Sequence, residues 1–404
     1  MNGEKKRMGL AVVAAALGYF VDAYDLILYN IVRVQSLQGI GVSQGDLLRI
    51  GVDLLNAQLL GMLAGGVFWG VVGDRRGRRS VLFGSILLYS VATLANGLIH
   101  SVTAYMVCRL VAGMGLAGEL GAGVTLVAEL LPKQTRGYGT MVVAAVGVTG
   151  VVTASLVAGT FHWRTAYLIG GGLGILLLFL RIGVSESGLF AKVRARTISR
   201  GNFFALFTRW ATFKKYVSVI LVALPIWFII GVLITFSPEL GQDMGLAVLP
   251  QAGRAVLWYY LGLTLGDVTT GYLSQRFANR KGVMATFLAI TALVGTAYFL
   301  FGGRSLGAYY LLCFALGWAS GYWAVFITMS AEQFGTNLRA TVATTAPNFV
   351  RGATVLLTIA FRQLGPRIGM RNAAVVLGIL SLVIGATALR QLDETFGKDL
   401  DYVE

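Results

Sequence analysis

The sequence predicts an all-α membrane protein whose twelve transmembrane helices form two pseudo-symmetric bundles of six. The chain has 404 residues, of which 56% are hydrophobic and only 13% are charged, whereas soluble domains average about 25% charged residues. Its apolar runs reach about 20 residues, which is the length that a helix needs to cross the hydrocarbon core of a bilayer. Because lipid offers no partner to backbone polar groups, we expect these runs to be helices.

The spans are predicted from the apolar runs in chain order. The first run is expected to be a retained helix, because no short apolar region with a small-residue cleavage site precedes it. The glycines of spans 2 and 4 are expected to allow close packing between helices. The runs cover residues 8–33, 50–72, 81–99, 103–130, 138–160, 164–183, 216–237, 252–274, 283–302, 307–330, 340–362 and 370–390.

The distribution of basic residues predicts the orientation of the chain. Lys and Arg gather before the first span and in the loops after spans 2, 4, 6 and 8. By the positive-inside rule, both termini are cytoplasmic, and we expect a multi-pass protein of the bacterial inner (plasma) membrane. Arg362, Arg367 and Arg371 would face outside, as an anion-attracting vestibule or without a role. The net charge of +15 does not indicate nucleic-acid binding, because the basic residues lie in short loops between spans.

A polar segment divides the chain into two halves. We predict an N-terminal bundle at 1–183, a cytoplasmic connecting segment at 184–215, and a C-terminal bundle with a short tail at 216–404. The loops Gly70–Leu82 (GVVGDRRGRRSVL) and Gly271–Val283 (GYLSQRFANRKGV) occupy corresponding places in the two halves. This weak internal repeat is typical of transporters with a central site between two bundles.

The opening helix carries two carboxylates in the middle of its span. Asp22 and Asp25 are three residues apart, and with Gly18 and Tyr29 they follow one helical stripe. An ionised Asp at mid-membrane costs roughly 2.5–3.5 kcal/mol on insertion scales, so this stripe should face protein or water. A group that changes charge inside the membrane can couple transport to protons. The alternative is a paired structural carboxylate that determines helix packing.

Further charged residues lie inside predicted spans. Arg109 and Glu119 are in span 4, and Glu119 is near the middle of the bilayer, where it is a second candidate for proton binding. Arg351 in span 11 has no nearby carboxylate in the sequence, so it needs a partner across the cavity. An anionic substrate is one candidate, because a guanidinium binds carboxylate or phosphate with two prongs; Asp267 in span 8 is the other.

Several classes of function are excluded by missing motifs. No phosphate-binding G-x-x-x-x-G-K-[ST] is present, so nothing indicates ATP as the energy source. His100 and His162 lie far from any Cys or His cluster, and no metal or other cofactor is expected. No soluble part of the chain is large enough to hold an enzyme site. We expect a monomer that binds a small anion and H⁺ within the lipid bilayer.

The motifs of the chain resemble those of the major facilitator superfamily over nearly its whole length. Gly70–Leu82 resembles the loop 2–3 signature G-x-x-x-D-R-x-G-R-R. RLVAGMGLAGELGAG, beginning at Arg109, is similar to span 4 of metabolite:proton symporters. FVDAYDL, beginning at Phe20, resembles span 1 of phosphate:proton symporters, and AEQFGTNLRAT, beginning at Ala331, resembles span 10 of metabolite symporters and organic-ion transporters.

The resemblance implies roles for individual residues. The loop 2–3 signature gates the cytoplasmic side, and spans 7 and 10 line the substrate cavity. Spans 1 and 4 lie side by side, which allows Arg109 to pair with Asp22 or Asp25; the alternative is a permanent ion pair. The implied gate residues are Asp74, Arg75, Arg78, Arg79, Glu129 and Arg136. Implied substrate contacts are Arg351, Arg109, Tyr29, Trp227, Trp318 and Tyr322, and Trp323 lies in the same region of span 10.

We therefore predict a secondary active transporter that works by alternating access. The preferred substrate is a small organic carboxylate moved together with protons bound at Asp22, Asp25 or Glu119. Inorganic phosphate:proton symport and proton-independent transport of an organic ion or sugar stay open as alternatives. Outside the transporter class, a non-transporting sensor of the same fold is the remaining alternative.

Overall fold

The computed structural model describes residues 2–76, 78–119, 136–185 and 203–398. These residues are helical and contain no strand, which confirms the predicted fold class. The N-terminal helices are α1 (Asn2–Gly39), α2 (Leu47–Arg76), α3 (Arg78–Asn96), α4 (Val102–Leu116), α6 (Arg136–Thr160) and α7 (Trp163–Ser185). The C-terminal helices are α8 (Trp210–Val222), α9 (Leu224–Phe228), α10 (Ser237–Asp243), α11 (Ala252–Arg276), α12 (Arg280–Phe301), α13 (Leu306–Ala319), α14 (Trp323–Glu332), α15 (Thr336–Ile368) and α16 (Met370–Arg390).

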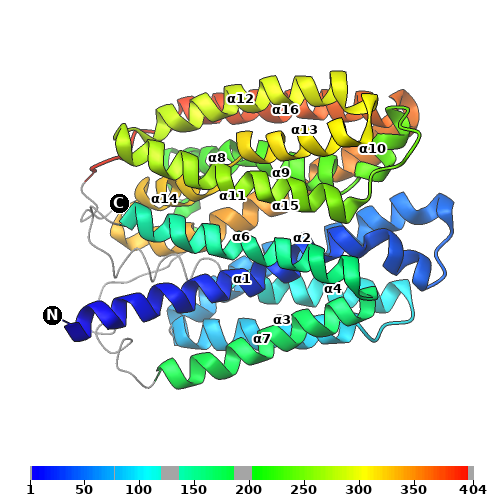
Figure 1. The fold of residues 1–404 in the computed structure, drawn as a ribbon. Coiled ribbons are helices and arrows are strands. Elements are labelled where there is room, and N and C mark those ends of the chain that lie inside the picture. Colours follow the sequence, from blue (N-terminus) through cyan, green and yellow to red (C-terminus); the bar gives the residue numbers. More distant parts are fainter. Residues whose placement is uncertain (1, 77, 120–135, 186–202, 399–404) are drawn as a thin grey trace.

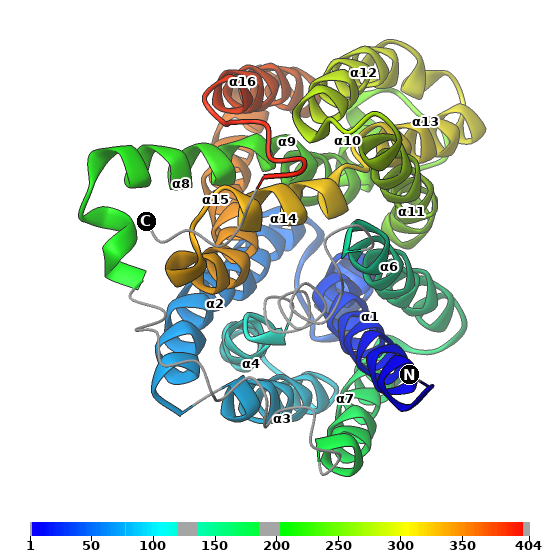
Figure 2. The same cartoon turned by 90° about the vertical axis from the view of Figure 1, so that its left-hand side faces the viewer.

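Two groups of helices lie against each other in the molecule. Figure 1 shows α1–α7 on one side and α8–α16 on the other, with the start of α1 and the end of α16 at the same end. The two groups meet where α2 packs against α15 and α6 packs against α11, as Figure 2 shows from that end. An even number of spans requires this placement of the two ends. The domain limits at 183 and 216 stay a prediction, and α8 begins at Trp210, inside the predicted connecting segment.

Over the residues that the structure describes, each predicted span coincides with one helix, except spans 7 and 10, which contain more than one. Within the described part of the chain, six helical segments can cross a membrane by length and composition alone, and a bent pair at Trp210–Val222 and Leu224–Ile234 makes a seventh. Other spans, such as α15, contain many polar residues that are buried between helices. Polar side chains that face the protein interior lower the mean hydropathy of a span, but these polar groups do not contact lipid.

Glycines allow α2 and α4 to approach closely, as the sequence predicts. A Cβ atom on Gly61 would collide with the carbonyl oxygen of Leu110, and one on Gly113 with that of Gln58. Small residues permit this backbone contact between membrane helices. The close packing brings α4, and with it Arg109, toward the opening helix.

Spans 7 and 10 are broken, whereas the apolar runs in the sequence predict a continuous helix for each. In span 7, α8 ends at Val222, Pro225 lies in the first turn of α9, and a π-helix follows at Ile229–Ile234. Proline removes an N–H donor and clashes with the preceding turn, which separates α8 from α9. In span 10, α13 ends at Ala319 and α14 begins at Trp323. Between them, Gly321 contacts the backbone of Gly266 in α11, where no larger residue fits.

The residues after α16 are attached to the start of α12. The Glu394 carboxylate accepts hydrogen bonds from the backbone N–H groups of Arg280 (3.1 Å) and Lys281 (2.8 Å). It also accepts from the N–H groups of Thr395 and Phe396. Burial alone would raise the pKa of Glu394, but these four donors hold the pKa below its usual value. Glu394 therefore caps the N-terminus of α12 from a distant part of the chain.

We expect Glu394→Ala to lower the thermal stability of the detergent-purified protein. Loss of a helix cap costs about 1 kcal/mol, which corresponds to a melting temperature lower by about 2 °C or less for a chain of this size. Because the folded-state pKa lies below the unfolded value of about 4.3, the stabilisation is complete above that pH and is lost as pH falls through the folded pKa. The melting temperature of the variant should therefore be below that of wild type at neutral pH and equal to it in acid. Asp393→Ala, which leaves Glu394 in place, should melt like wild type at neutral pH; equal loss in both variants would contradict the assignment.

Candidate functional site

Arg351 of α15 is the centre of the candidate substrate site. Its side chain is 1% exposed. The guanidinium carbon lies 5.3 Å from the ring centroid of Trp227 in α9 and 5.8 Å from that of Trp323 in α14. The two indoles are 6.3 Å apart at an interplanar angle of 62°. A buried cation between two aromatic rings can bind a flat anion by charge and by stacking.

The two helix breaks position these indoles. Trp227 lies in α9, directly after the break in span 7, and Trp323 is the first residue of α14, directly after the break in span 10. Asp267 of α11 stabilises the second break, because its Oδ1 accepts a hydrogen bond from the N–H of Ala324 (3.0 Å). The structure therefore gives Asp267 the role of a helix cap and does not place it as the partner of Arg351.

The N-terminal bundle contributes acidic and phenolic groups to the same region. Asp22 of α1 is fully buried and interacts electrostatically with Arg351, Glu119 and Asp25. Neither of its carboxylate oxygens has a hydrogen-bond partner among the described residues. Tyr19, three residues earlier, is buried and interacts electrostatically with Arg351 and Asp22. The two predicted carboxylates Asp22 and Glu119 thus share one cluster with the predicted cation Arg351.

Asn348 connects this cluster to both bundles. Its Oδ1 accepts a hydrogen bond from Nη1 of Arg351 (3.4 Å), and its Nδ2 donates to the carbonyl of Ala117 in the N-terminal bundle (2.9 Å). The absent side chain of Gly66 in α2 leaves room for it. Asn348 and Tyr19 are not among the site residues predicted from the sequence. Asn348 is three residues before Arg351, and Tyr19 is three residues before Asp22. A search for polar residues on the same helix face as each predicted site residue would have found both.

Asp25 belongs to a second cluster inside the N-terminal bundle. It accepts a hydrogen bond of 2.5 Å from the hydroxyl of Thr93 in α3 and interacts electrostatically with Arg109 of α4. Arg109 is fully buried, donates to the Oε1 of Gln58, and lies over the rings of Tyr29 and Tyr167. Oδ1 of Asp25 and Nη1 of Arg109 have no hydrogen-bond partner in the described part of the chain. Asp25 and Arg109 interact electrostatically without a direct ion pair within 4.0 Å, so their predicted pairing stays a prediction.

The remaining predicted substrate contacts lie elsewhere. Tyr29 lies beside Arg109, and its hydroxyl donates to the carbonyl of Gly51 in α2 (3.0 Å). The ring of Trp318 packs against that of Phe287 in α12, with the ring centroids 5.3 Å apart. Tyr322 donates to the carbonyl of Val222 (3.2 Å) and so joins the two helix breaks. The structure does not bring these three side chains to the Arg351 cluster.

The predicted gate residues are placed only by their backbone. Asp74 and Arg75 lie in the last turn of α2, and Arg78 and Arg79 begin α3. Arg136 begins α6, and Glu129 lies outside the described residues. The gating role of these residues stays a prediction.

Polar contacts between the bundles gather at the end opposite the chain termini. Nη2 of Arg33 in α1 donates to both carboxylate oxygens of Glu239 in α10, at 2.6 and 2.8 Å. In addition, Arg362 of α15 pairs with Asp53 of α2, and the hydroxyl of Thr358 donates to Asn56 at 2.6 Å. These contacts connect the bundles at this end. The ion pair with Asp53 also explains why Arg362 lies on the predicted outer side, against the positive-inside rule. The described state is therefore closed at this end.

We expect Glu239→Gln to open this end of the molecule. Arg33 is fully buried, and removing one partner of a buried ion pair costs about 3–5 kcal/mol because the other charge is left uncompensated. Opening would expose Arg33 to water and relieve that cost. Spin labels at Gln44 and Val248, on the two bundles, should show longer distances in the variant, in a background without Cys108 and Cys313.

Arg49→Gln is the matched control for this measurement. It breaks the exposed ion pair between Arg49 and Asp46 at the same end, but within one bundle. Its distance distribution should equal that of the parent. An unchanged distribution in Glu239→Gln would show that the Arg33 ion pair does not hold the end closed.

Comparisons with known proteins agree with this architecture. The sequence profile described as Major Facilitator Superfamily matches residues 10–258. The chain is 25% identical to the putative niacin/nicotinamide transporter NiaP of Bacillus subtilis, over 89% of this chain and 90% of that protein. It is 26% identical to a gentisate transporter of Corynebacterium glutamicum, over 96% of this chain and 89% of that protein. The structure of the proton:xylose symporter XylE aligns with a TM-score of 0.73 at 17% identity, over 98% of both chains.

The fold, the buried charges and these similarities lead to one assignment. The family profile covers more than half of the chain, and the helical architecture matches that of a solved transporter over almost its full length. This chain belongs to the Major Facilitator Superfamily and is a multi-pass membrane transporter, not an enzyme.

Proposed function

We propose that this transporter is a proton-coupled symporter of small organic anions, with aromatic carboxylates as the preferred class. The observation that carries the proposal is the buried Arg351 guanidinium between the indoles of Trp227 and Trp323. The guanidinium can bind a carboxylate through two parallel hydrogen bonds. The indoles can hold the attached ring by stacking, which is worth about 0.5–1.5 kcal/mol beyond area burial.

The similar proteins support the same class of substrate. One is named for niacin or nicotinamide and another for gentisate. Niacin and gentisate are both aromatic rings that carry a carboxylate. Phosphate is less favoured as a substrate. It carries more oxygens than a carboxylate, and the only hydrogen-bond donors of the two indoles beside Arg351 are their ring N–H groups.

Coupling to protons is supported by Asp22, which interacts with Arg351, and by Glu119, which interacts with Asp22. A substrate carboxylate on Arg351 would be repelled by Asp22 and Glu119, which interact with each other in the same cluster. A proton on one of these acids weakens that repulsion, so binding of the proton and of the anion favour each other. The Asp25 and Arg109 cluster supplies a second pair of opposite charges, inside the N-terminal bundle. Protonation of Asp25 would remove its attraction to Arg109.

Uptake into proteoliposomes tests the proposal. With a more acidic outside, labelled nicotinate or gentisate should accumulate above its external concentration, and a protonophore should abolish the accumulation. Inorganic phosphate should not accumulate. Uptake that is indifferent to the pH gradient would make the protein a uniporter, and uptake of phosphate alone would favour the alternative symporter. Binding of the carboxylates without any flux would indicate a sensor.

A further inference from the structure

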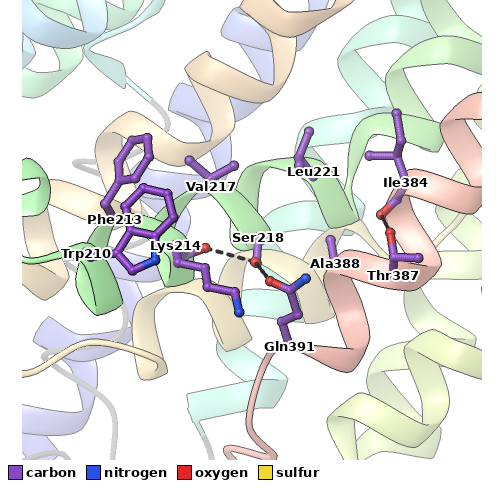
Figure 3. Close-up of a pocket in the computed structure, with 10 residues that line it drawn as sticks. All are labelled: Trp210, Phe213, Lys214, Val217, Ser218, Leu221, Ile384, Thr387, Ala388 and Gln391. Carbon is purple, nitrogen blue, oxygen red and sulfur yellow. Dashed lines mark hydrogen bonds between the residues drawn. The ribbon is translucent and has the colours of Figure 1, made fainter.

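A groove between α8 and α16 lies outside the proposed transport site. It has a volume of about 240 Å³ and lies at the end of the molecule where α16 ends. Its apolar part is lined by Val217 and Leu221 of α8 and by Ile384 of α16, which are labelled in Figure 3. Near the start of α8, Lys214 and the amide of Gln391 form a polar part, where Ser218 donates to Gln391 Oε1 (3.1 Å).

The apolar part of the groove is oriented toward lipid. Trp210, at the start of α8, is 75% exposed, and Val383, next to the groove on α16, is 55% exposed. Exposed apolar side chains on a transmembrane helix contact acyl chains, and Trp is typical of the interface between lipid and water. From Trp210 to Leu221 the groove follows α8 for about 16 Å, roughly half of the hydrocarbon core.

The polar part of the groove carries an unpaired positive charge. Lys214 is exposed, and its ammonium has no acidic partner among the described residues. Arg209, the exposed residue that directly precedes α8, adds positive charge near the start of this helix. A basic site between membrane helices with an apolar extension complements an anionic lipid headgroup and its acyl chain. A free anion has no acyl chain that could occupy the apolar part of the groove.

We propose that this groove binds an anionic phospholipid, with its phosphate at Lys214 and one acyl chain along Val217, Leu221 and Ile384. The site is connected to the substrate region through packing. Gly385 and Gly378 of α16 allow close contact with Pro225 and Phe228 of α9, on either side of Trp227. A lipid that holds α8 against α16 would therefore stabilise the broken span that presents this indole. The lipid site does not depend on which substrate is transported.

Thermal stability of the delipidated protein in detergent provides the test. Phosphatidylglycerol should raise the melting temperature of wild type more than phosphatidylcholine does, and sodium phosphate should have no effect. Lys214→Gln should weaken binding of phosphatidylglycerol about fivefold, as expected for one basic residue at the membrane surface, and should abolish the preference between the lipids. Lys214→Arg should keep it.

Two further variants complete the test. Thr387→Trp places a large side chain in the groove from an exposed position and should reduce the effect of both lipids. Arg276→Gln removes an exposed positive charge at the end of α11 and should behave like wild type. Equal stabilisation by the two lipids, or a wild-type response in both Lys214→Gln and Thr387→Trp, would overturn the proposal. Native mass spectrometry should show one retained phosphatidylglycerol in wild type that is lost in Thr387→Trp.

Discussion

Arg351→Ala is expected to abolish detectable binding of an aromatic carboxylate. The guanidinium is buried between two indoles, and truncating one partner of a buried, hydrogen-bonded charge pair costs about 2–5 kcal/mol. This corresponds to about a 30-fold to several-thousand-fold loss of affinity. Calorimetry or tryptophan fluorescence with nicotinate would measure it, since Trp227 and Trp323 lie against the ligand in the proposed site.

Companion variants separate recognition from folding. Arg351→Lys keeps the charge but loses the planar fork, so binding should be intermediate. Arg371→Gln removes an outer arginine that donates to the carbonyl of Phe299 and should bind like wild type. Trp323→Ala should weaken binding of aromatic carboxylates more than that of aliphatic ones. Normal affinity in a folded Arg351→Ala protein would remove the proposed anion site.

Asp25→Asn is expected to abolish accumulation driven by the pH gradient while leaving substrate binding within about threefold of wild type. Asp25 interacts with Arg109 and Thr93, away from Arg351. The substitution removes the second proposed proton site, on which the transition between the two open states depends, but keeps a polar side chain of similar size. Exchange of labelled for unlabelled substrate across the liposome membrane should continue, because exchange needs no net movement of protons.

Asp22→Asn should behave differently from Asp25→Asn. It removes a negative charge that faces Arg351, so nicotinate binding should strengthen and lose most of its dependence on pH. Asp267→Asn is the matched control, because Asp267 is an equally buried carboxylate that caps α14, and Asn can accept the same hydrogen bond. Its uptake should stay coupled to the gradient. Accumulation by both Asp22→Asn and Asp25→Asn at the wild-type level would refute proton coupling through the opening helix.

The fold was predictable because lipid restricts a spanning chain to helices. Apolar runs predicted even the limits of α16, observed at Met370–Arg390. The breaks in spans 7 and 10 were not predicted, although Pro225 and Gly321 are visible in the sequence. A proline or glycine inside an apolar run is compatible with a continuous membrane helix when neighbours compensate. Whether the helix breaks depends on contacts such as those of Gly321 with α11 and Asp267 with Ala324.

By itself the sequence determined that this is a helical membrane transporter with buried charges at Asp22, Asp25, Arg109, Glu119 and Arg351. It did not determine which of these charges meet. Asp22 and Asp25 are three residues apart, yet their directions differ by roughly 60° around a helix of 3.6 residues per turn. In the structure Asp22 faces the other bundle and Arg351, whereas Asp25 faces Thr93 and Arg109 within its own bundle. Only the packing of helices far apart in the chain decides this, because a charge inside a membrane protein is stabilised by whichever partner the tertiary structure brings near.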